Sequence, residues 1–381
     1  MNDYPAIENH GLIGDLQTAA LVSTEGTIDW LCLPRFDSPS VFASLLDREH
    51  GGHFSIKAIG DGVVTRQMYL PGTAIIVTRF MSADGVGEVV DFMPIAGEVA
   101  TQRHRLVRLI RVVRGHMRFE FECVPRFEYG REEPAIESHP GGVTFRGSNM
   151  SLNLSVMTNW VQTGEAIQQV AGGRLLATRT LTEGEFAGIM IESQPDGPPQ
   201  PISADGLMEL FEQTRTFWRD WLAQSTYRGR WREAVERSAM TLKLMTYAPT
   251  GALVAAPTAG LPEQVGGERN WDYRFTWVRD ASFSVYALLS LGYTEEARAF
   301  ITWLKDRLAE RNGNGDTPLQ IMYRVDGSPD LHEEVLEHLA GYKDSRPVRI
   351  GNGAAGQMQL DIFGEALDSV YLGDQHRLPM S

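Results

Sequence analysis

The residues from Arg269 to Asp280 form the densest cluster of chemistry-bearing side chains in this sequence. Within this run four aromatic residues are interleaved with three arginines and two aspartates. Flat aromatic faces pack against the apolar C–H face of a pyranose, and Arg and Asp side chains make paired hydrogen bonds with neighbouring hydroxyls. The composition of the run therefore indicates a sugar-binding site.

The same run also suits a purely structural role. Asp280 stands at the expected start of a helix, where a carboxylate can cap the first turn and pair with Arg279. The aromatic side chains of Tyr273 and Trp277 are equally suited to ordinary core packing. Composition alone leaves the binding role and the structural role open.

A second polar stretch, Pro347–Gln357, contains a literal G-x-G-x-x-G from Gly351 to Gly356. This fingerprint binds dinucleotides inside a βαβ unit that places an acidic residue on a second strand about 20 positions later. No βαβ pattern precedes it here, and no second strand is expected after it. We therefore expect a glycine-permitted turn before a helix, and a dinucleotide-dependent oxidoreductase is the weakest function considered.

Metal and nucleotide chemistry have little support elsewhere in the sequence. His332 and His338 are six positions apart, a spacing that does not place two ligands on one face of a helix, so a solvated acidic helix is expected there. Neither a G-x-S-x-G nor a P-loop pattern occurs. The sequence predicts no metal site and no cofactor.

The elements that must position these residues change in character along the chain. From His53 to Glu192 short segments rich in β-formers, several alternating with period two, are separated by turn residues, which predicts an antiparallel sandwich. The proline-rich stretch Gln194–Pro201 cannot continue a sheet. The predicted strands are His53–Ala58, Val64–Leu70, Ala74–Ser82, Val86–Phe92, Arg105–Arg114, Met117–Val124, Gly142–Arg146, Leu152–Met157 and Leu175–Leu181.

Beyond residue 200 the apolar period changes to that of a helix. Because strands precede helices without βαβ alternation, we expect separate domains: a β-sandwich over 1–200, a helical linker over 201–230 and a helical domain over 231–381. The predicted helices are an apolar stripe from Leu207 to Leu222, Arg232–Tyr247, Asp280–Leu291, Thr294–Arg311 and Gly356–Tyr371.

Composition narrows the partners and the compartment. The 381-residue chain carries a formal charge of -14 and no basic run, so nucleic acid and anionic membranes are not expected partners. Cys32 and Cys123 are expected to be free, packed thiols. Because the N-terminus lacks a signal-peptide pattern and no apolar stretch reaches membrane-spanning length, we expect a cytoplasmic protein. The oligomeric state stays open.

Three separated segments resemble glycoside hydrolase family 15, which comprises glucoamylases, glucodextranases and trehalases. They are the tetrad Trp277-Val278-Arg279-Asp280, the preceding Leu242–Tyr247, and the N-terminal run Asp29–Pro39. The resemblance implies a β-sandwich followed by an (α/α)6 barrel that hydrolyses α-glucosidic bonds with inversion. Its substrates include trehalose, starch-like chains and dextrins, and the N-terminal run slightly favours trehalase.

The resemblance also implies roles for individual residues. Arg279 and Asp280 match the pair that grips hydroxyls of the non-reducing-end glucose, and Tyr273 and Trp277 match aromatics of the same subsite. The Pro347–Gln357 stretch resembles a second sugar-contacting loop. Its binding candidates are Arg349, Asn352 and Gln357.

Inverting hydrolysis needs a carboxylic acid and a carboxylate roughly 6.5 to 9.5 Å apart. In the family both are glutamates in later parts of the barrel, and nothing after Tyr371 resembles the acid-bearing loop. We therefore expect the acid and base to lie beyond Ser381, which makes the chain a C-terminally truncated member with little hydrolytic activity of its own. The alternative is a sugar-binding or structural protein that has lost catalysis.

Only four of the barrel's twelve helices are expected between Trp231 and Ser381. Apolar faces on the helices near the C-terminus are therefore expected to lack packing partners. Such faces are an aggregation liability unless another chain covers them.

Overall fold

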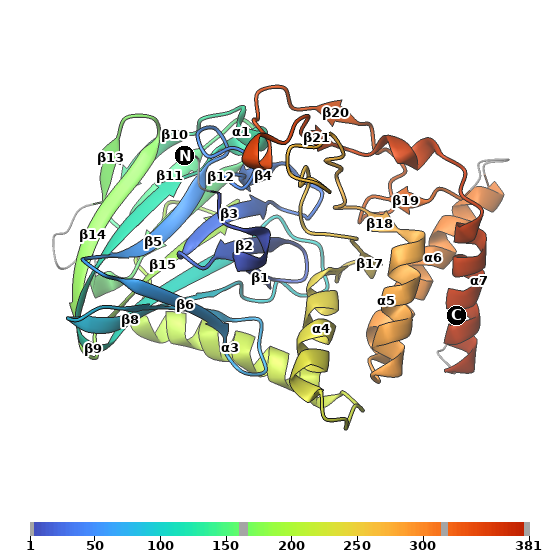
Figure 1. Ribbon diagram of the computed structural model, residues 1–381, viewed down its shortest axis with the longest axis horizontal. Helices are drawn as coiled ribbons and strands as arrows, with labels where there is room; N and C mark the ends of the chain where they lie inside the picture. The colour runs from blue at the N-terminus through green and yellow to red at the C-terminus, as the bar shows by residue number, and fades with distance from the viewer. Residues whose placement is uncertain (1–3, 160–166, 314–318, 377–381) are drawn as a thin grey trace. The chain divides into compact units, whose positions relative to one another are not determined.

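The computed structural model describes residues 4–159, 167–313 and 319–376 and divides into two compact units (Figure 1). Unit 1 comprises 1–15, 19–96 and 101–219, and unit 2 comprises 16–18, 97–100 and 220–381. The boundary at Arg219 and Asp220 falls inside one helix, α3 (Ala204–Ala223). A large antiparallel β region thus precedes a helical part, as the sequence predicted. The predicted domain limits at residues 200 and 230 stay predictions.

Unit 1 is built from antiparallel strands around one long strand, β9. Among the residues that the structure describes, unit 1 also contains the short elements η1 (Ile7–Asn9) and α1 (Phe127–Gly130). The strands are β1 (His10–Gly14), β2 (Ala19–Ser23), β3 (Thr27–Cys32), β4 (Ser40–Phe42), β5 (His53–Ile59), β6 (Val64–Tyr69), β7 (Ile76–Met81), β8 (Gly85–Phe92), β9 (Arg105–Val124), β10 (Ala135–His139), β11 (Gly142–Arg146), β12 (Ser151–Val156), β13 (Gln168–Val170), β14 (Arg174–Thr182) and β15 (Phe186–Ser193).

Strand β9 connects two sets of strands. Its first half pairs with β8 and β15, and its second half pairs with β14 and β5. The sequence predicted two strands here, but Gly115, with a φ of 68°, lies between the halves without ending the strand. Aliphatic and aromatic side chains from both sets fill one continuous core that includes Phe54, Phe119 and Phe121. The fold of unit 1 therefore depends on β9.

Every predicted strand is confirmed to within about two residues at its ends, apart from the merger in β9. Strands β1 to β4, β10, β13 and β15 were not predicted. Several of them, such as β3 and β15, are buried along nearly their whole length. A strand buried on both faces shows no period-two alternation, so no periodic signal marks it in the sequence.

Unit 2 contains four helices of ten residues or more that begin after residue 230 among the described residues, as predicted. They are α4 (Arg232–Leu244), α5 (Val278–Ser290), α6 (Thr294–Gly313) and α7 (Asp361–Gln375). The shorter elements are β16 (Thr246–Tyr247), β17 (Ala252–Leu253), β18 (Thr276–Trp277), β19 (Met322–Tyr323), β20 (Glu334–Val335), η2 (Tyr342–Asp344), β21 (Arg349–Ile350) and η3 (Gly353–Gly356).

Helices α5, α6 and α7 pack against one another (Figure 1). The Ser369 hydroxyl of α7 donates to the Ser282 hydroxyl of α5 at 2.8 Å. Large apolar side chains are exposed on both helices, with Phe283 61% exposed on α5 and Leu367 72% exposed on α7, and α7 also exposes Asp368 and Asp374. The expectation that apolar faces of these helices lack packing partners stays a prediction.

The structure also bears on three smaller predictions. Cys32 and Cys123 are buried and free, as expected. The G-x-G-x-x-G run follows β21, which pairs antiparallel with β20, so the run does not open a βαβ unit and the dinucleotide interpretation loses its structural basis. In the part of the chain that the structure describes, no helix has both the length and the apolarity needed to cross a membrane. Residues 377–381 lie outside the described residues.

Candidate functional site

The residues predicted to bind sugar lie where a short strand turns into a helix. Thr276 of β18 pairs with Tyr323 of β19, and the Val278 amide donates to the Ile321 carbonyl at 3.0 Å. Trp277, in extended conformation, is the N-cap residue of α5. The cap is thus not Asp280, which lies with Arg279 in the first turn of the helix, where the helix dipole stabilises its negative charge.

Arg279 is the centre of a small charged cluster. Its Nη2 lies 3.1 Å from Asp280 Oδ2, and its Nη1 lies 3.4 Å from Asp361 Oδ2 at the start of α7. Its guanidinium carbon lies 5.3 Å from the centre of the Trp277 ring, within cation–π range. The three charged side chains are 37%, 43% and 41% exposed. The cluster therefore opens to solvent and does not brace a packed interior.

Two polar atoms at this cluster have no hydrogen-bond partner among the described residues. They are the Trp277 Nε1 donor and the Asp280 Oδ2 acceptor, both shielded from solvent. The contact between Arg279 and Asp280 is an ion pair without hydrogen-bond geometry. A shielded polar atom without a partner is costly, so a ligand that supplies one would be stabilised here.

The Tyr273 side chain is half-buried beside Trp277. The two ring centres are 6.2 Å apart with planes tilted by 37°. Burial, together with the negative charge of Glu263, raises the pKa of the Tyr273 phenol above its ordinary value. The phenol therefore stays protonated and can donate a hydrogen bond.

The middle of the Arg269–Asp280 run has the structural role that the sequence left open. Asp272 and Arg274 form a fully buried ion pair, with Arg274 Nε and Nη2 donating to the Asp272 carboxylate at 2.9 and 2.7 Å. The same carboxylate accepts the Gly351 amide at 3.1 Å. Asp272 thus ties the aromatic run to the Pro347–Gln357 stretch.

The three candidates in the Pro347–Gln357 stretch differ in how their side chains are used. Arg349 donates to the Glu268 carbonyl at 2.7 Å and stacks over Trp271 at 4.7 Å. Asn352 is buried: its amide donates to the Asp272 carbonyl at 3.0 Å, and its oxygen accepts the amide of the residue two positions later. Gln357 is exposed. Their roles toward a sugar stay predictions, and the contacts of Asn352 hold the loop.

The sequence did not predict the roles that three residues of this region have in the structure. Asp361 escaped notice because the helix was predicted to begin at Gly356, whereas η3 occupies 353–356 and α7 begins at Asp361. Asp272 and Arg274 were seen only as part of the cluster. Their alternation of charge at i and i+2 was the available signal for a local pair, but burial of that pair is not readable from it.

Comparison with known proteins identifies the family. Residues 229–378 match the family model described as glycosyl hydrolases family 15, and residues 2–180 match the model described as trehalase-like, N-terminal. The chain thus contains a glycosyl hydrolase family 15 region, residues 229–378, that follows a trehalase-like N-terminal region, residues 2–180. The family predicted from the tetrad at Trp277 and its companion segments is therefore confirmed.

Relatives of this family 15 protein carry the name trehalase. The chain is 38% identical to a trehalase of Mycolicibacterium smegmatis, 36% to one of Mycobacterium tuberculosis and 34% to one of Thermoplasma volcanium. The alignments cover 99%, 99% and 97% of this chain but 58%, 57% and 57% of those relatives. The chain thus spans less than three fifths of the length of these relatives.

A solved structure shares the fold at low sequence identity. A bacterial glucoamylase complexed with acarbose matches 99% of this chain and 56% of its own, with a TM-score of 0.62 and 12% identity. At that identity the match supports the fold alone. A β region followed by helices is thus the arrangement found in a glucoamylase.

Proposed function

We propose that this chain binds the glucosyl end of an α-glucoside at the cluster formed by Trp277, Arg279, Asp280 and Asp361, and that trehalose is the preferred ligand. The observation that carries the proposal is the open Arg279–Asp280 pair, in which the shielded Asp280 Oδ2 accepts no hydrogen bond and beside which the shielded Trp277 Nε1 donates none among the described residues. We choose trehalose over starch-like chains or dextrins because relatives of this chain carry the name trehalase.

The proposed binding chemistry follows from the side chains. The Asp280 carboxylate accepts hydrogen bonds from vicinal hydroxyls, Arg279 donates from N–H groups that its two carboxylate partners leave unused, and the Trp277 ring packs on the C–H face of the sugar. Tyr273 adds a neutral phenol donor. Gln357, which is exposed, completes the site from the second loop. Arg349 and Asn352 have partners in the protein already, so they contribute by holding that loop.

The reaction proposed for this family 15 protein is inverting hydrolysis of α-glucosidic bonds without a cofactor. The proposed scaffold is a β-sandwich followed by the first part of an (α/α)6 barrel. We assign the catalytic acid and base to no residue of this chain, and the expectation of little hydrolysis by the chain alone stays a prediction. A sugar-binding protein without catalysis is the second candidate, since the contacts that support binding do not require turnover.

Calorimetric titration of the 381-residue chain with trehalose and with glucose tests the binding proposal. We expect saturable binding that Asp280→Ala weakens by at least about tenfold, because a charge-assisted acceptor is lost. Glu295→Ala is the matched control, since Glu295 is also an exposed carboxylate in the first turn of a helix and pairs with an arginine, Arg298. Equal affinity in Asp280→Ala and Glu295→Ala would show the assignment wrong.

Incubation with trehalose and with maltooligosaccharides tests catalysis in the same preparation. Binding without glucose release favours the second candidate. Glucose release at a rate typical of enzymes would show the expectation of little hydrolysis wrong and would assign the catalytic groups to this chain.

A further inference from the structure

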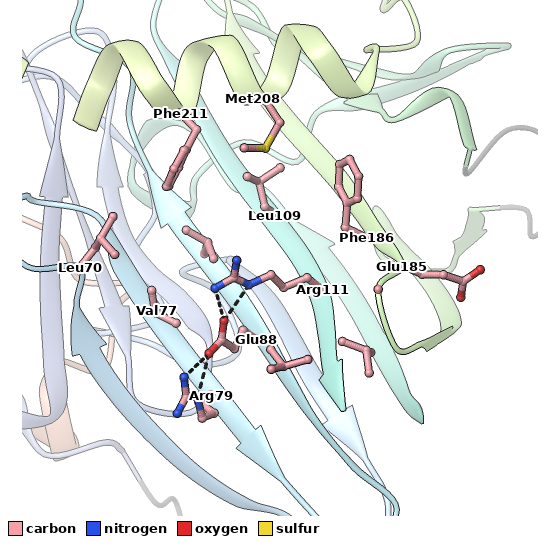
Figure 2. Close-up of a pocket in the computed structure, with 14 residues that line it drawn as sticks. Leu70, Val77, Arg79, Glu88, Leu109, Arg111, Glu185, Phe186, Met208 and Phe211 are labelled. Carbon is pink, nitrogen blue, oxygen red and sulfur yellow. Dashed lines mark hydrogen bonds and ion pairs between the residues drawn. The ribbon is translucent and has the colours of Figure 1, made fainter. Parts of the chain in front are cut away.

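Unit 1 contains a cavity of about 460 Å³ that has no part in the site described above. It lies on one face of β7, β8, β9 and β15, beside helix α3 (Figure 2). Most of its lining is aliphatic or aromatic, and Met208 and Phe211 reach toward it from α3 (Figure 2). Its size lies within the range of small-molecule sites, roughly 300 to 1,000 Å³.

One row of residues across the sheet supplies the polar part of this cavity. Arg79 of β7 lies opposite Glu88 of β8, and Glu88 lies opposite Arg111 of β9. Arg111 in turn lies opposite Phe186 of β15. Figure 2 shows the two guanidinium groups on either side of the Glu88 carboxylate. The sequence offered no sign of this row, because its members are far apart along the chain.

The next row on the same face is apolar and supports the helix. Val77, Val90 and Leu109 lie opposite one another on the same three strands. The following position, Gly188 of β15, has no side chain, and a Cβ there would collide with Leu207 of α3. The helix thus packs closely over the apolar row, and the cavity opens where the row of charged residues begins.

The Glu88 carboxylate is only 1% exposed and ionised. Burial alone would raise the pKa of this carboxyl, but hydrogen bonds from Arg79 and Arg111 outweigh burial, so the pKa of Glu88 lies below its ordinary value. The Nε atoms of Arg79 and Arg111 donate at 2.8 and 2.7 Å, one to each carboxylate oxygen. Two positive charges against one negative charge leave the row with a formal charge of +1.

Each arginine keeps unused donors. Nε and Nη2 of both side chains contact Glu88, and the Nη1 groups have no partner among the described residues. Arg79 and Arg111 are 41% and 56% exposed, so these donors are accessible. The nearby Glu185 does not compete for them, since its carboxylate accepts from the Thr182 amide and hydroxyl and points away in Figure 2.

We propose that this cavity binds a small amphipathic carboxylate, whose anionic head contacts the free Nη1 groups of Arg79 and Arg111 and whose apolar body lies along Leu109, Met208 and Phe211. An anion fits because planar guanidinium donors match a carboxylate and the Nη1 groups of both arginines are available to it. An apolar body fits because Met208, 40% exposed, and the half-buried Phe186 and Phe211 lack full cover.

A purely structural ladder is the competing explanation. In that case the arginine stems would cover this face of the sheet and their head groups would interact only with Glu88 and water. The ladder explanation predicts no saturable ligand and no dependence of binding on Met208, so the two explanations separate by experiment.

Calorimetric titration of the whole chain with sodium decanoate, below the concentration at which it forms micelles, tests the proposal. We expect saturable binding, at least about tenfold weaker in Arg111→Gln because a charge-assisted donor is removed. Met208→Ala should weaken binding several-fold through lost apolar contact, without changing the charges. Acetate, which lacks the apolar body, and decanol, which lacks the charge, should both bind more weakly than decanoate.

Arg105→Gln is the matched control, because Arg105 is also on β9 and also pairs with a carboxylate, that of Glu192, at 2.7 Å. We expect decanoate to bind this variant as it binds the unaltered chain. Absence of saturable decanoate binding, equal affinity for decanol, or equal weakening in Arg105→Gln and Arg111→Gln would overturn the proposal. Unaltered affinity in Met208→Ala would overturn the placement of the apolar body even if Arg111→Gln failed to fold.

Discussion

Two arginine–aspartate pairs, one in each unit, use the same chemistry in opposite ways. In unit 1, Arg108 and Asp91 are fully buried, and the guanidinium also donates to the backbone carbonyls of Phe54 and Gly26 at 2.6 and 2.7 Å. In unit 2, the Arg279–Asp280 pair is over one third exposed and includes an acceptor without a hydrogen-bond partner.

The difference shows how a bracing pair is distinguished from a binding pair. The Arg108 guanidinium donates to the Asp91 carboxylate and to two backbone carbonyls, so few of its N–H donors are left for a ligand. Arg279 sits between two carboxylates and an aromatic face, with part of its surface open. Residue type is the same in both pairs, and only burial and the number of satisfied atoms separate them.

The largest effect on stability is expected from the unit 1 pair. Arg108→Met should lower the free energy of unfolding by about 3 to 5 kcal/mol, because Asp91 is left as a buried charge without a partner. Urea denaturation measures this loss. Arg105→Met on the same strand, where the side chain is 36% exposed, should cost less than about 1 kcal/mol. Equal losses in the two variants would contradict the distinction.

The buried pair within the unit 2 run tests whether bracing residues control the binding loop. Asp272→Ala removes the acceptor of both Arg274 and the Gly351 amide, and we expect a loss of about 2 to 4 kcal/mol in unfolding free energy. Sugar binding should also fall, because the loop is no longer held. Normal trehalose affinity in a folded Asp272→Ala variant would show that the loop is positioned independently.

Acid titration tests a further set of ion pairs in unit 1, those of Glu122. Hydrogen bonds from His53 and Arg174 lower the pKa of Glu122 from 4.5 to about 2. Because the folded-state pKa is depressed, the stabilisation is fully present above pH 4.5 and is lost as pH falls toward 2. We expect about 1 to 2 kcal/mol after solvent screening. Unfolding measured between pH 5 and pH 2.5 should show a shallower decline in Glu122→Gln than in the unaltered chain.

The unit 2 pair should contribute little to stability. Arg279→Met is expected to change the free energy of unfolding by less than about 1 kcal/mol, as for other exposed ion pairs. Binding of trehalose should nevertheless weaken by at least about tenfold. A stability loss comparable to that of Arg108→Met would make Arg279 a bracing residue.

The smallest stability effect is expected on the exposed face of α5 and α7. Leu367→Ser, at a side chain 72% exposed, should change unfolding free energy by about 0.5 kcal/mol or less. Self-association measured by analytical ultracentrifugation should decrease, because an uncovered apolar patch is reduced. Unchanged sedimentation across concentrations in both proteins would argue against association through this face.

Much of the fold was readable from local patterns. Strand β6, for example, alternates between exposed and half-exposed positions, so period two was visible, and helix α3 carries an apolar stripe. Strands such as β3, buried along nearly their whole length, were missed because burial on both faces removes the alternation. The merger of two predicted strands into β9 depended on pairing partners far away along the chain.

The sequence alone determined the family, the order of β region and helices, and the residue types available at the candidate site. Only the tertiary structure decided that Asp272 and Arg274 are buried while Arg279 and Asp280 are open, that Asp361 joins Arg279, and that Arg79, Glu88 and Arg111 form one row. The physical reason is that solvent exposure and ion pairing across strands and helices depend on chain segments that are remote in sequence. The local composition around an arginine and an aspartate is the same whether the pair ends up buried or open to solvent.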